Sequence, residues 1–254
     1  MDYQHISFEV ASGVARLTFK RPPLNVLNIA MMREVNSALD RFDQATAKVL
    51  VFAAEGKAFS AGVDVAEHTA DKVGEMIEVF HGIFRRLNHL DTPTLAIVQG
   101  VALGGGCEVA LFCDMVLASD KAKFGQPEIK VGVLPPIAAV MLPRLVPNKK
   151  ALELLLIGDT IDATEAHRLG LVNQVVPVDQ LPAAANELIG KLASLSGAVL
   201  QMTKRAARLG GQGAFGEALN QVESLYLSEL MKTHDANEGL TAFLEKRPPV
   251  WKDQ

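Results

Sequence analysis

The sequence has few cysteines and no long hydrophobic run, and each absence argues against a class of protein. Its two cysteines, Cys107 and Cys113, fit neither a usual zinc spacing nor a disulfide framework, which favours a reduced, cytoplasmic setting. The longest apolar stretches, residues 94–106 and 131–142, are shorter than the roughly 18–20 residues that a membrane-spanning helix needs. No basic segment followed by an apolar run stands at the N-terminus, so no secretory signal and no membrane association are expected.

Positive charge is also scarce. The chain has 25 Lys and Arg against 29 Asp and Glu, a formal net charge of −4, and no basic block, so it is not expected to bind nucleic acid. None of the 6 histidines has the spacing of metal ligands, and no metal site is predicted. What is abundant is apolar residues, at 49% of the chain with a mean hydropathy of +0.18. Without a membrane span, this surplus predicts a large core and additional surface buried in an oligomer.

Short apolar strands alternate with amphipathic helices in the first half of the chain. Asn28 and Asp71 each stand where a side chain can cap a helix whose apolar residues recur at helical spacing. Strands are expected at residues 6–10, 14–19, 49–53, 94–98, 115–118 and 123–125. This alternation is typical of an α/β fold in which helices cover the sheets.

The chain after residue 135 is predominantly helical. Asp235 and Glu238 have the spacing of a capping box at the start of the last helix. Helices are expected at about residues 138–145, 149–156, 163–169, 182–195, 198–209, 216–231 and 236–245. We therefore divide the chain into an α/β core, residues 1–196, and a C-terminal helical region, residues 197–254, whose apolar faces need a partner outside the region itself.

The stretch from Ile97 to Glu108 is the strongest candidate for a site. A buried strand leads into the glycines Gly104–Gly106, which begin a helix whose first N–H groups are unpaired donors at the positive end of the helix dipole. An anion site and a tight turn that requires small residues both predict this pattern. The spacing fits neither a dinucleotide fingerprint nor a P-loop. Glu108 either complements the helix dipole or acts as an acid–base group.

Two further stretches could carry chemistry. The small-residue loop from Lys57 to Asp64 can present backbone N–H groups to a ligand, and its Ser60 lies in a partial G-x-S-x-G pattern that lacks the first glycine. Glu128 follows Pro127 among apolar residues. A carboxyl group there either has a raised pKa and a proton to donate or faces solvent in a turn.

Together these stretches resemble the enoyl-CoA hydratase/isomerase (crotonase) superfamily, and the resemblance extends over nearly the whole chain. The matching segments are, in order, Arg21-Pro22 with Asn25-Val26-Leu27, then AFSAGVD, ALGGGCE, FGQPE and finally AFLEKR at residues 242–247. The resemblance implies a spiral of ββα units with a C-terminal helical region that mediates a homotrimer or a dimer of trimers. It also implies an acyl-CoA thioester as substrate and no separate cofactor, since coenzyme A is part of the substrate.

The same resemblance implies roles for particular residues. The family's oxyanion hole of two backbone N–H groups falls on Val63 and Gly105, which would polarise the thioester carbonyl. The two glutamates of the family's hydratases match Glu108, as activator of the water, and Glu128, as donor of the proton to Cα. Further substrate contacts are expected at Leu24, Val26, Ala61, Gly62, Asp64, Val65, Ala66, Gly104, Pro127, Pro135 and Pro136, with Phe243 and Lys246 contributed by the same or a neighbouring subunit.

The chain departs from the family pattern just after FGQPE. Most members have a glycine-rich P-G-x-G-G-T-x-R stretch there, whereas this chain has Leu134-Pro135-Pro136-Ile137-Ala138 and no glycine until well beyond it. We expect Pro135 and Pro136 to form a wall of the acyl pocket. The pair resembles the branch that hydrates cyclic dienoyl-CoA thioesters such as cyclohexa-1,5-diene-1-carbonyl-CoA in aromatic degradation, and a bulkier wall is also compatible with a short-chain hydratase.

Three alternatives to a hydratase stay open on the sequence alone. One is a Δ3,Δ2-enoyl-CoA isomerase, which needs only the carboxylate matching Glu128. Another is a serine hydrolase that uses Ser60. The third is a non-catalytic relative that binds acyl-CoA or RNA, although the acidic charge balance argues against RNA.

Overall fold

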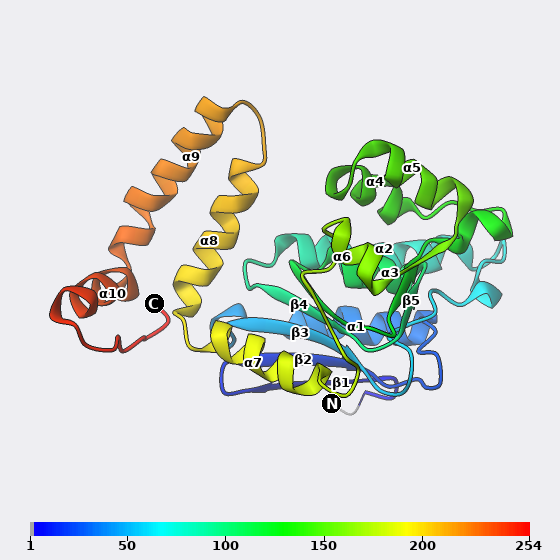
Figure 1. Ribbon diagram of the computed structural model, residues 1–254, viewed down its shortest axis with the longest axis horizontal. Helices are drawn as coiled ribbons and strands as arrows, with labels where there is room; N and C mark the ends of the chain where they lie inside the picture. Colours follow the sequence, from blue (N-terminus) through cyan, green and yellow to red (C-terminus); the bar gives the residue numbers. More distant parts are fainter. Residues whose placement is uncertain (1–2) are drawn as a thin grey trace.

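The main sheet has six strands in the order β1-β2-β3-β4-β6-β9 in the computed structural model, which describes residues 3–254 (Figure 1). The predicted hairpin is confirmed: β1 (Ile6–Ala11) and β2 (Val14–Phe19) pair antiparallel across Ser12 and Gly13, which both have positive φ. All later pairings in this sheet are parallel. Its other strands are β3 (Val49–Ala54), β4 (Thr94–Val98), β6 (Met115–Ser119) and β9 (Gln174–Val176).

A second sheet of three strands, β5-β7-β8, branches from the first. The chain leaves β4 at Val98 and enters β5 (Val101–Leu103) through Gly100, where a Cβ atom would lie 1.9 Å from the carbonyl oxygen of Lys57. Only glycine fits such a close approach of two backbones. The other strands of this sheet are β7 (Lys123–Gly125) and β8 (Thr160–Asp162). The sequence analysis expected the strand at residues 94–98 and did not predict β5, which is short and lies between Gly100 and the glycines 104–106.

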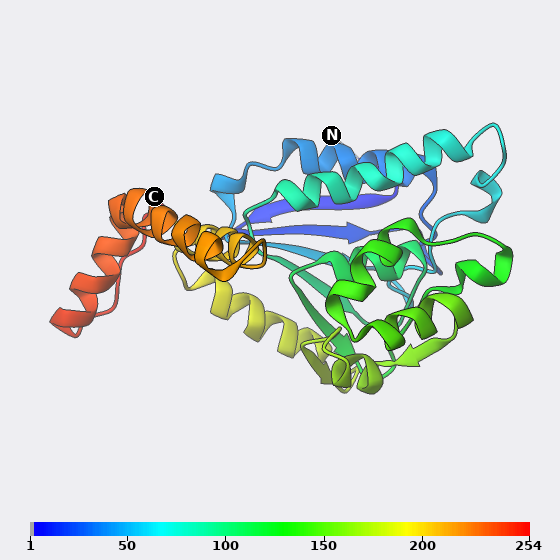
Figure 2. The same ribbon diagram turned by 90° about the horizontal axis from the view of Figure 1, so that it is seen from above.

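Helices cover both faces of the main sheet, as Figure 2 shows, with α1 (Ile29–Arg41) and α2 (Val73–His89) on one side and α7 (Leu181–Ala193) on the other. Successive residues of a strand face opposite sides, so β3 directs Leu50 and Phe52 toward the α1–α2 core and Val49 and Val51 toward α7. A strand buried on both faces has the continuous apolar run found in the sequence.

The two predicted helix caps had different outcomes. The side chain of Asn28 accepts a hydrogen bond from the N–H of Met31 at 3.0 Å, so it caps α1 as expected. The expectation for Asp71 is wrong: α2 starts after Lys72, at Val73, and no side-chain capping bond is found there in the described chain. Asp71 stands one residue too early, in the turn that precedes the helix.

The helices that lie between β5 and β9 in the sequence form a layer over the second sheet. It confirms the helical character expected after residue 135, with α4 starting two residues earlier than predicted, at Pro136. The elements of this layer are α3 (Gly105–Phe112), η3 (Pro127–Val131), α4 (Pro136–Leu145), α5 (Asn148–Ile157) and α6 (Ala163–Arg168). Two further 3-10 helices lie outside it: η1 (Gln44–Thr46) follows α1, and η2 (Val65–Glu67) precedes α2.

The C-terminal helices form an arm that projects from the α/β body in both ribbon views (Figures 1 and 2). The arm consists of α8 (Gly197–Gly210), α9 (Phe215–Ser228), η4 (Leu230–Lys232) and α10 (His234–Glu245). Its start coincides with the boundary that we drew at residue 196, and the division of the chain into two domains stays a prediction.

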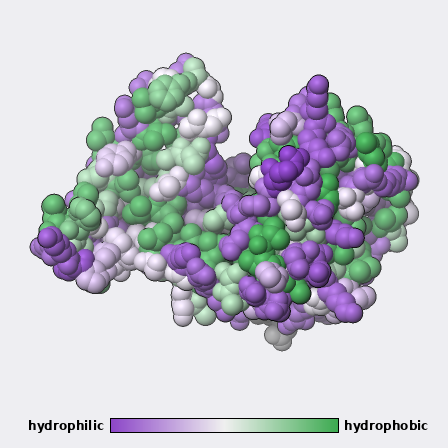
Figure 3. Space-filling model, viewed as in Figure 1, coloured by the Kyte–Doolittle hydropathy of each residue, from purple (hydrophilic) through white to green (hydrophobic). Residues whose placement is uncertain are grey.

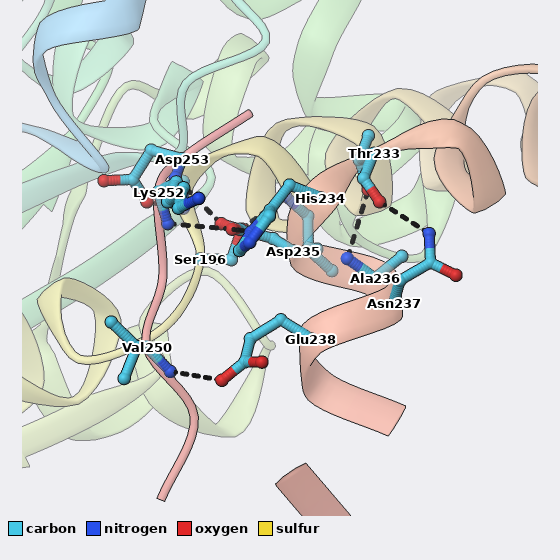
Figure 4. Close-up of polar contacts among 12 residues, drawn as sticks. Ser196, Thr233, His234, Asp235, Ala236, Asn237, Glu238, Val250, Lys252 and Asp253 are labelled. Carbon is cyan, nitrogen blue, oxygen red and sulfur yellow. Dashed lines mark hydrogen bonds and ion pairs between the residues drawn. The ribbon is translucent and has the colours of Figure 1, made fainter. Parts of the chain in front are cut away.

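The predicted capping box at Asp235 is wrong, and the structure shows another role for this residue (Figure 4). Thr233 caps α10 by accepting from the N–H of Ala236 at 3.1 Å. Asp235 is 1% exposed and accepts from Ser196 Oγ at 2.5 Å and from the N–H groups of Lys252 and Asp253 at 2.8 and 2.9 Å. This carboxylate therefore joins the base of the arm to the C-terminal segment.

Large apolar side chains are exposed on the arm, and Figure 3 shows apolar residues on one face of it. Others lie at the start of α9 and at the end of α10. Phe215 and Phe243 are each 82% exposed and Leu244 is 79% exposed. Exposed aromatic and leucine side chains at this density are typical of surface that another chain covers. None of the helices within residues 3–254 is long and apolar enough to cross a membrane.

Candidate active site

A cavity of about 520 Å³ opens between α2, the start of α3 and the segment from η3 to α4. Its lining includes residues from four distant parts of the chain, and most of them are apolar. They are Ala61, Gly62, Val63, Val65, His68, Val73, Met76, Ile77, Phe80, Gly104, Gly105, Glu108, Pro127, Glu128, Lys130, Val131, Val133, Leu134, Pro135 and Pro136. A smaller cavity of about 230 Å³ lies between the body and the arm and involves none of the predicted site residues.

The three consecutive glycines each make a close contact that a side chain would prevent. A Cβ atom on Gly104, which has φ of +49°, would lie 2.5 Å from Glu128 Oε1. One on Gly105 would lie 2.7 Å from the side chain of Val63, and one on Gly106 would lie 2.5 Å from the carbonyl oxygen of Ser60. Gly104 is thus required both by its positive φ and by the close approach of Glu128, whereas Gly105 and Gly106 are required by the segments that pack against them.

Two backbone N–H groups beside these glycines are candidates for an oxyanion hole. Leu27 holds the loop on both sides of Val63, because its N–H donates to the oxygen of Gly62 at 2.8 Å and its oxygen accepts from the N–H of Asp64 at 3.0 Å. Since the N–H groups of an extended segment alternate in direction, that of Val63 points away from this bridge. Gly105 is the first residue of α3, so its N–H has no helical acceptor.

Glu108 is buried within the cavity wall, at 2% exposure. Its Oε1 accepts a hydrogen bond from the N–H of Ala138 at 2.7 Å, at the start of α4, where Pro136 has no N–H to offer. The pKa of Glu108 is raised to about 8, with burial as the largest cause; the N–H groups of Ala138 and Ile137 oppose the shift, and the nearby charge of Glu128 contributes to it. Glu108 is therefore a buried carboxyl group with a raised pKa, not an exposed acidic residue that only complements the helix dipole.

Glu128 lies in η3 across the same cavity and is half-buried. Burial raises the pKa of its carboxyl group as well. Gln126 is 1% exposed, and its neighbours determine which way its side-chain amide points. In the orientation that satisfies both ends of the amide, its nitrogen donates to the two carboxylate oxygens of Glu128 at 3.2 and 3.3 Å. The cavity therefore contains two carboxyl groups with raised pKa, and the solvent-facing interpretation of Glu128 is wrong.

Most of the predicted contact residues surround this cavity. Those in its lining are Ala61, Gly62, Val65, Gly104, Pro127, Pro135 and Pro136. Leu24, Val26, Asp64 and Ala66 are not in the lining that the described residues form. Asp64 caps η2 through the N–H of Ala66 at 3.1 Å and lies 3.8 Å from Arg21, and both contacts stabilise the loop. Contact of these four residues with coenzyme A outside the cavity stays a prediction.

Several lining residues were not predicted. On α2, Val73, Met76, Ile77 and Phe80 recur at helical spacing and line the cavity, a role that the sequence did not predict for them. The same periodicity was the available signal, but it cannot distinguish a wall of a cavity from a packed interface. Gln126 was missed too, although it lies inside FGQPE. Phe243 and Lys246 belong to the end of the arm, which lies away from α2 and α3 in Figures 1 and 2.

Ser60 does not face the cavity. Its side chain is completely buried, and its Oγ donates to the carbonyl oxygen of Asn25 at 2.8 Å. A hydroxyl in this position cannot reach a ligand in the cavity, and the serine-hydrolase interpretation has no support in the structure.

Comparison with known proteins identifies the class to which this fold and site belong. A family model described as enoyl-CoA hydratase/isomerase matches residues 9–254, so the chain belongs to that family. The resemblance inferred from the sequence is thereby confirmed, and with it an enzyme of the hydratase type.

Individual relatives and solved structures agree with the family match. The cyclohexa-1,5-dienecarbonyl-CoA hydratase of Thauera aromatica is 40% identical over 95% of this chain and 94% of its own. The crotonyl-CoA hydratase of Syntrophomonas wolfei is 36% identical over 97% of each chain. The crystal structure of the enoyl-CoA hydratase of Bacillus anthracis superimposes with a TM-score of 0.93 at 31% identity, covering 99% of this chain and 100% of the other.

Proposed function

We propose that this protein is a hydro-lyase that adds water across the Cα=Cβ bond of an enoyl-CoA thioester. One observation carries the proposal: two carboxyl groups with raised pKa, Glu108 and Glu128, face a single apolar cavity next to two backbone N–H groups, those of Val63 and Gly105. The relatives named as hydratases of enoyl-CoA thioesters support it.

The two N–H groups are proposed to hold the thioester oxygen. When an oxygen nucleophile bonds to Cβ, the electron pair of the double bond moves through Cα toward the carbonyl, and negative charge develops on the thioester oxygen. Two preorganised N–H donors stabilise this enolate, and loss of one donor in an oxyanion hole costs about 10²–10³-fold in rate. The start of α3 also contributes the positive end of its dipole.

The two glutamates are proposed to divide the proton transfers. An ionised Glu108 accepts a proton from the water whose oxygen bonds to Cβ, and a protonated Glu128 gives its proton to Cα as the carbonyl re-forms. The pair begins and ends the reaction with one proton between them. No group beyond these side chains, the backbone donors and the substrate takes part in the reaction as proposed.

This division of roles requires a movement of the shared proton. In the free protein, the deeper burial of Glu108 favours its protonated form. The N–H groups of Ala138 and Ile137 favour the ionised form, and they remain in place when a substrate displaces solvent from the cavity. We propose that substrate binding places the proton on Glu128, so that Glu108 is the base.

The acyl group that we propose is a cyclic dienoyl group such as cyclohexa-1,5-diene-1-carbonyl. Pro135 and Pro136 line the cavity with rigid rings next to Glu108, and the relative from Thauera aromatica is named for this substrate. The test compares turnover of cyclohexa-1,5-diene-1-carbonyl-CoA with that of crotonyl-CoA, followed by the loss of conjugated absorbance. Equal or faster turnover of crotonyl-CoA would contradict the cyclic substrate and leave hydration itself intact.

A Δ3,Δ2-enoyl-CoA isomerase is the second candidate, because Glu128 lies beside Gly104 where a single carboxylate could move a proton between carbons. The variants Glu108→Gln and Glu128→Gln separate the two reactions. A hydratase loses activity in either variant, whereas an isomerase keeps its activity in Glu108→Gln and loses it only in Glu128→Gln. A non-catalytic acyl-CoA-binding relative would turn over neither substrate.

We also propose that the protein forms a homotrimer or a dimer of trimers in the cytoplasm. The exposed aromatic and leucine side chains of the arm, such as Phe215 and Phe243, support an oligomer. The free thiols of Cys107 and Cys113, both buried, are compatible with a reducing compartment. Light scattering on the eluted protein measures the mass directly, and a stable monomer would contradict the assembly.

A further inference from the structure

Ser60 is a buried polar residue that the proposed mechanism does not use, and it contacts both segments that carry the proposed oxyanion donors. Its Oγ accepts from the N–H of Gly62, the residue before Val63, at 3.2 Å, and donates to the carbonyl oxygen of Asn25 at 2.8 Å. Its own carbonyl oxygen accepts from the N–H of Leu103, two residues before Gly105, at 2.9 Å. Ser60 thus bonds to both backbone segments that carry the proposed oxyanion donors, those of Val63 and Gly105.

Packing reinforces these bonds. A Cβ atom on Gly106 would lie 2.6 Å from Ser60 Cβ and 2.8 Å from Ser60 Oγ, so the first turn of α3 rests directly on this side chain. The acceptor Asn25 is itself held in place, because its Nδ2 donates to the carbonyl oxygens of Glu55 and Ala58 at 2.8 and 2.9 Å. The hydroxyl of Ser60 therefore connects a fixed carbonyl on one side with the oxyanion loop on the other.

The bond from Ser60 holds the N–H of Gly62, whose carbonyl oxygen accepts from the N–H of Leu27 at 2.8 Å. Gly62 has a φ of +104°, a conformation open to glycine, so rotation about its backbone can turn the following peptide, which includes the N–H of Val63. An oxyanion donor must lie within about 2.7–3.1 Å of the oxygen that it stabilises. A small rotation at Gly62 is enough to leave that range.

We propose that Ser60 is a positioning residue that sets the separation and direction of the two N–H donors at Val63 and Gly105. This inference rests on the proposed function in one respect, since it takes those two groups to be the donors for the thioester oxygen. Ser60 itself contacts no substrate.

The experiment compares Ser60→Ala with a matched control, Ser119→Ala. Ser119 is also fully buried, and its Oγ makes the same pair of bonds, donating to the carbonyl oxygen of Gln99 at 2.7 Å and accepting from the N–H of Lys121 at 3.1 Å. It does not line the cavity that the described residues form. Each variant leaves one carbonyl and one N–H group without its hydrogen-bond partner, so both should lower the thermal midpoint.

The two variants should differ in catalysis. With the better of the two enoyl-CoA substrates, kcat of Ser60→Ala should fall by about 10- to 100-fold, the effect of a displaced donor, while KM changes by less than about threefold. The pH profile should keep its shape, since neither carboxyl group is touched. Ser119→Ala should keep the kcat of the unmodified protein.

A spectroscopic measurement reports on the donors directly. Butyryl-CoA and cyclohexanecarbonyl-CoA, labelled with ¹³C at the thioester carbonyl, are saturated and cannot be hydrated. Hydrogen bonding in the hole should lower the carbonyl stretching frequency of the bound thioester in the unmodified protein and in Ser119→Ala. In Ser60→Ala the frequency should move back toward that of the free thioester. Because only folded protein binds the thioester, a loss of stability does not affect this signal.

Two results would overturn the proposal: unmodified kcat and carbonyl frequency in Ser60→Ala, or an equal loss of kcat in Ser119→Ala. Failure of the proposed function gives a different result, since the unmodified protein would then hydrate neither substrate. The carbonyl frequency of a bound thioester would still show in that case whether Ser60 orients the two donors.

Discussion

Replacing Glu108 by glutamine should abolish hydration and at the same time stabilise the protein above neutral pH. Glutamine keeps an oxygen that can accept from the N–H of Ala138, and it has no charge at any pH. In the unmodified protein, burial raises the pKa of this carboxyl group from its ordinary value of 4.5 to about 8. A buried acid of this kind costs stability whenever it must ionise.

The pH dependence follows from the two pKa values. Below pH 4.5 the carboxyl group is protonated in both the folded and the unfolded chain, and it costs nothing. Between pH 4.5 and about 8 the unfolded chain releases its proton while the folded chain retains it, so the stability of the unmodified protein falls as pH rises and then levels off. At about 1.4 kcal/mol for each pKa unit, the limit is about 5 kcal/mol, and we expect a difference in stability of about 2–5 kcal/mol.

The assay is chemical denaturation of both proteins at pH 5, 7 and 9 at one protein concentration. The advantage of Glu108→Gln should be below about 1 kcal/mol at pH 5 and reach its full value at pH 9. Glu78→Gln, at an exposed position of α2, is the matched control and should show no such trend. The reasoning is refuted if the difference between Glu108→Gln and the unmodified protein is the same at pH 5 and pH 9.

The remaining predictions concern the site and the arm. The pH profile of kcat/KM should be bell-shaped, because the pair of carboxyl groups is active with one proton between them. Activity should fall above about pH 8, where the pair loses this proton, and at acidic pH, where both groups are protonated. A flat profile from pH 6 to 10 would contradict this. Gly104→Ala should lower kcat at least about tenfold, since its Cβ would lie 2.5 Å from Glu128 Oε1; unchanged kcat in steady-state assays would contradict that contact. Asp235→Ala should destabilise the arm by about 2–4 kcal/mol, because it leaves Ser196 and two backbone N–H groups without their acceptor. Limited proteolysis of the C-terminal segment should detect this change, with Glu223→Gln on α9 as the control.

The parts of the fold that depend on local pattern were predicted well. The hairpin at Ser12–Gly13, the cap at Asn28 and the buried strands near residues 49 and 94 follow from turn chemistry and from the period of the apolar residues. The caps assigned to Asp71 and Asp235 were wrong, because several polar residues near each helix start could serve, and the helix start depends on tertiary packing.

The order of the small-residue loop, the glycines and the two glutamates was sufficient to indicate the family and the candidate catalytic residues. These features lie in short, continuous segments, and their chemistry depends mainly on residue type. The departure at Pro135 and Pro136 was also visible in the sequence, and the structure shows both prolines in the lining of the cavity. The oligomer that the high hydropathy predicts stays a prediction, now with the exposed side chains of the arm as its physical basis.

The sequence by itself thus determined the family, the α/β class and which residues are candidates for chemistry. Only the tertiary structure decided that the N–H of Ala138 binds Glu108 across 30 positions of sequence, that Gln126 contacts Glu128, and that Ser60 bonds to both oxyanion segments instead of facing a ligand. The reason is physical. Residue type and period determine which face a side chain occupies, whereas its partner, and with it the pKa and the geometry of the site, depends on which distant segment packs against that face.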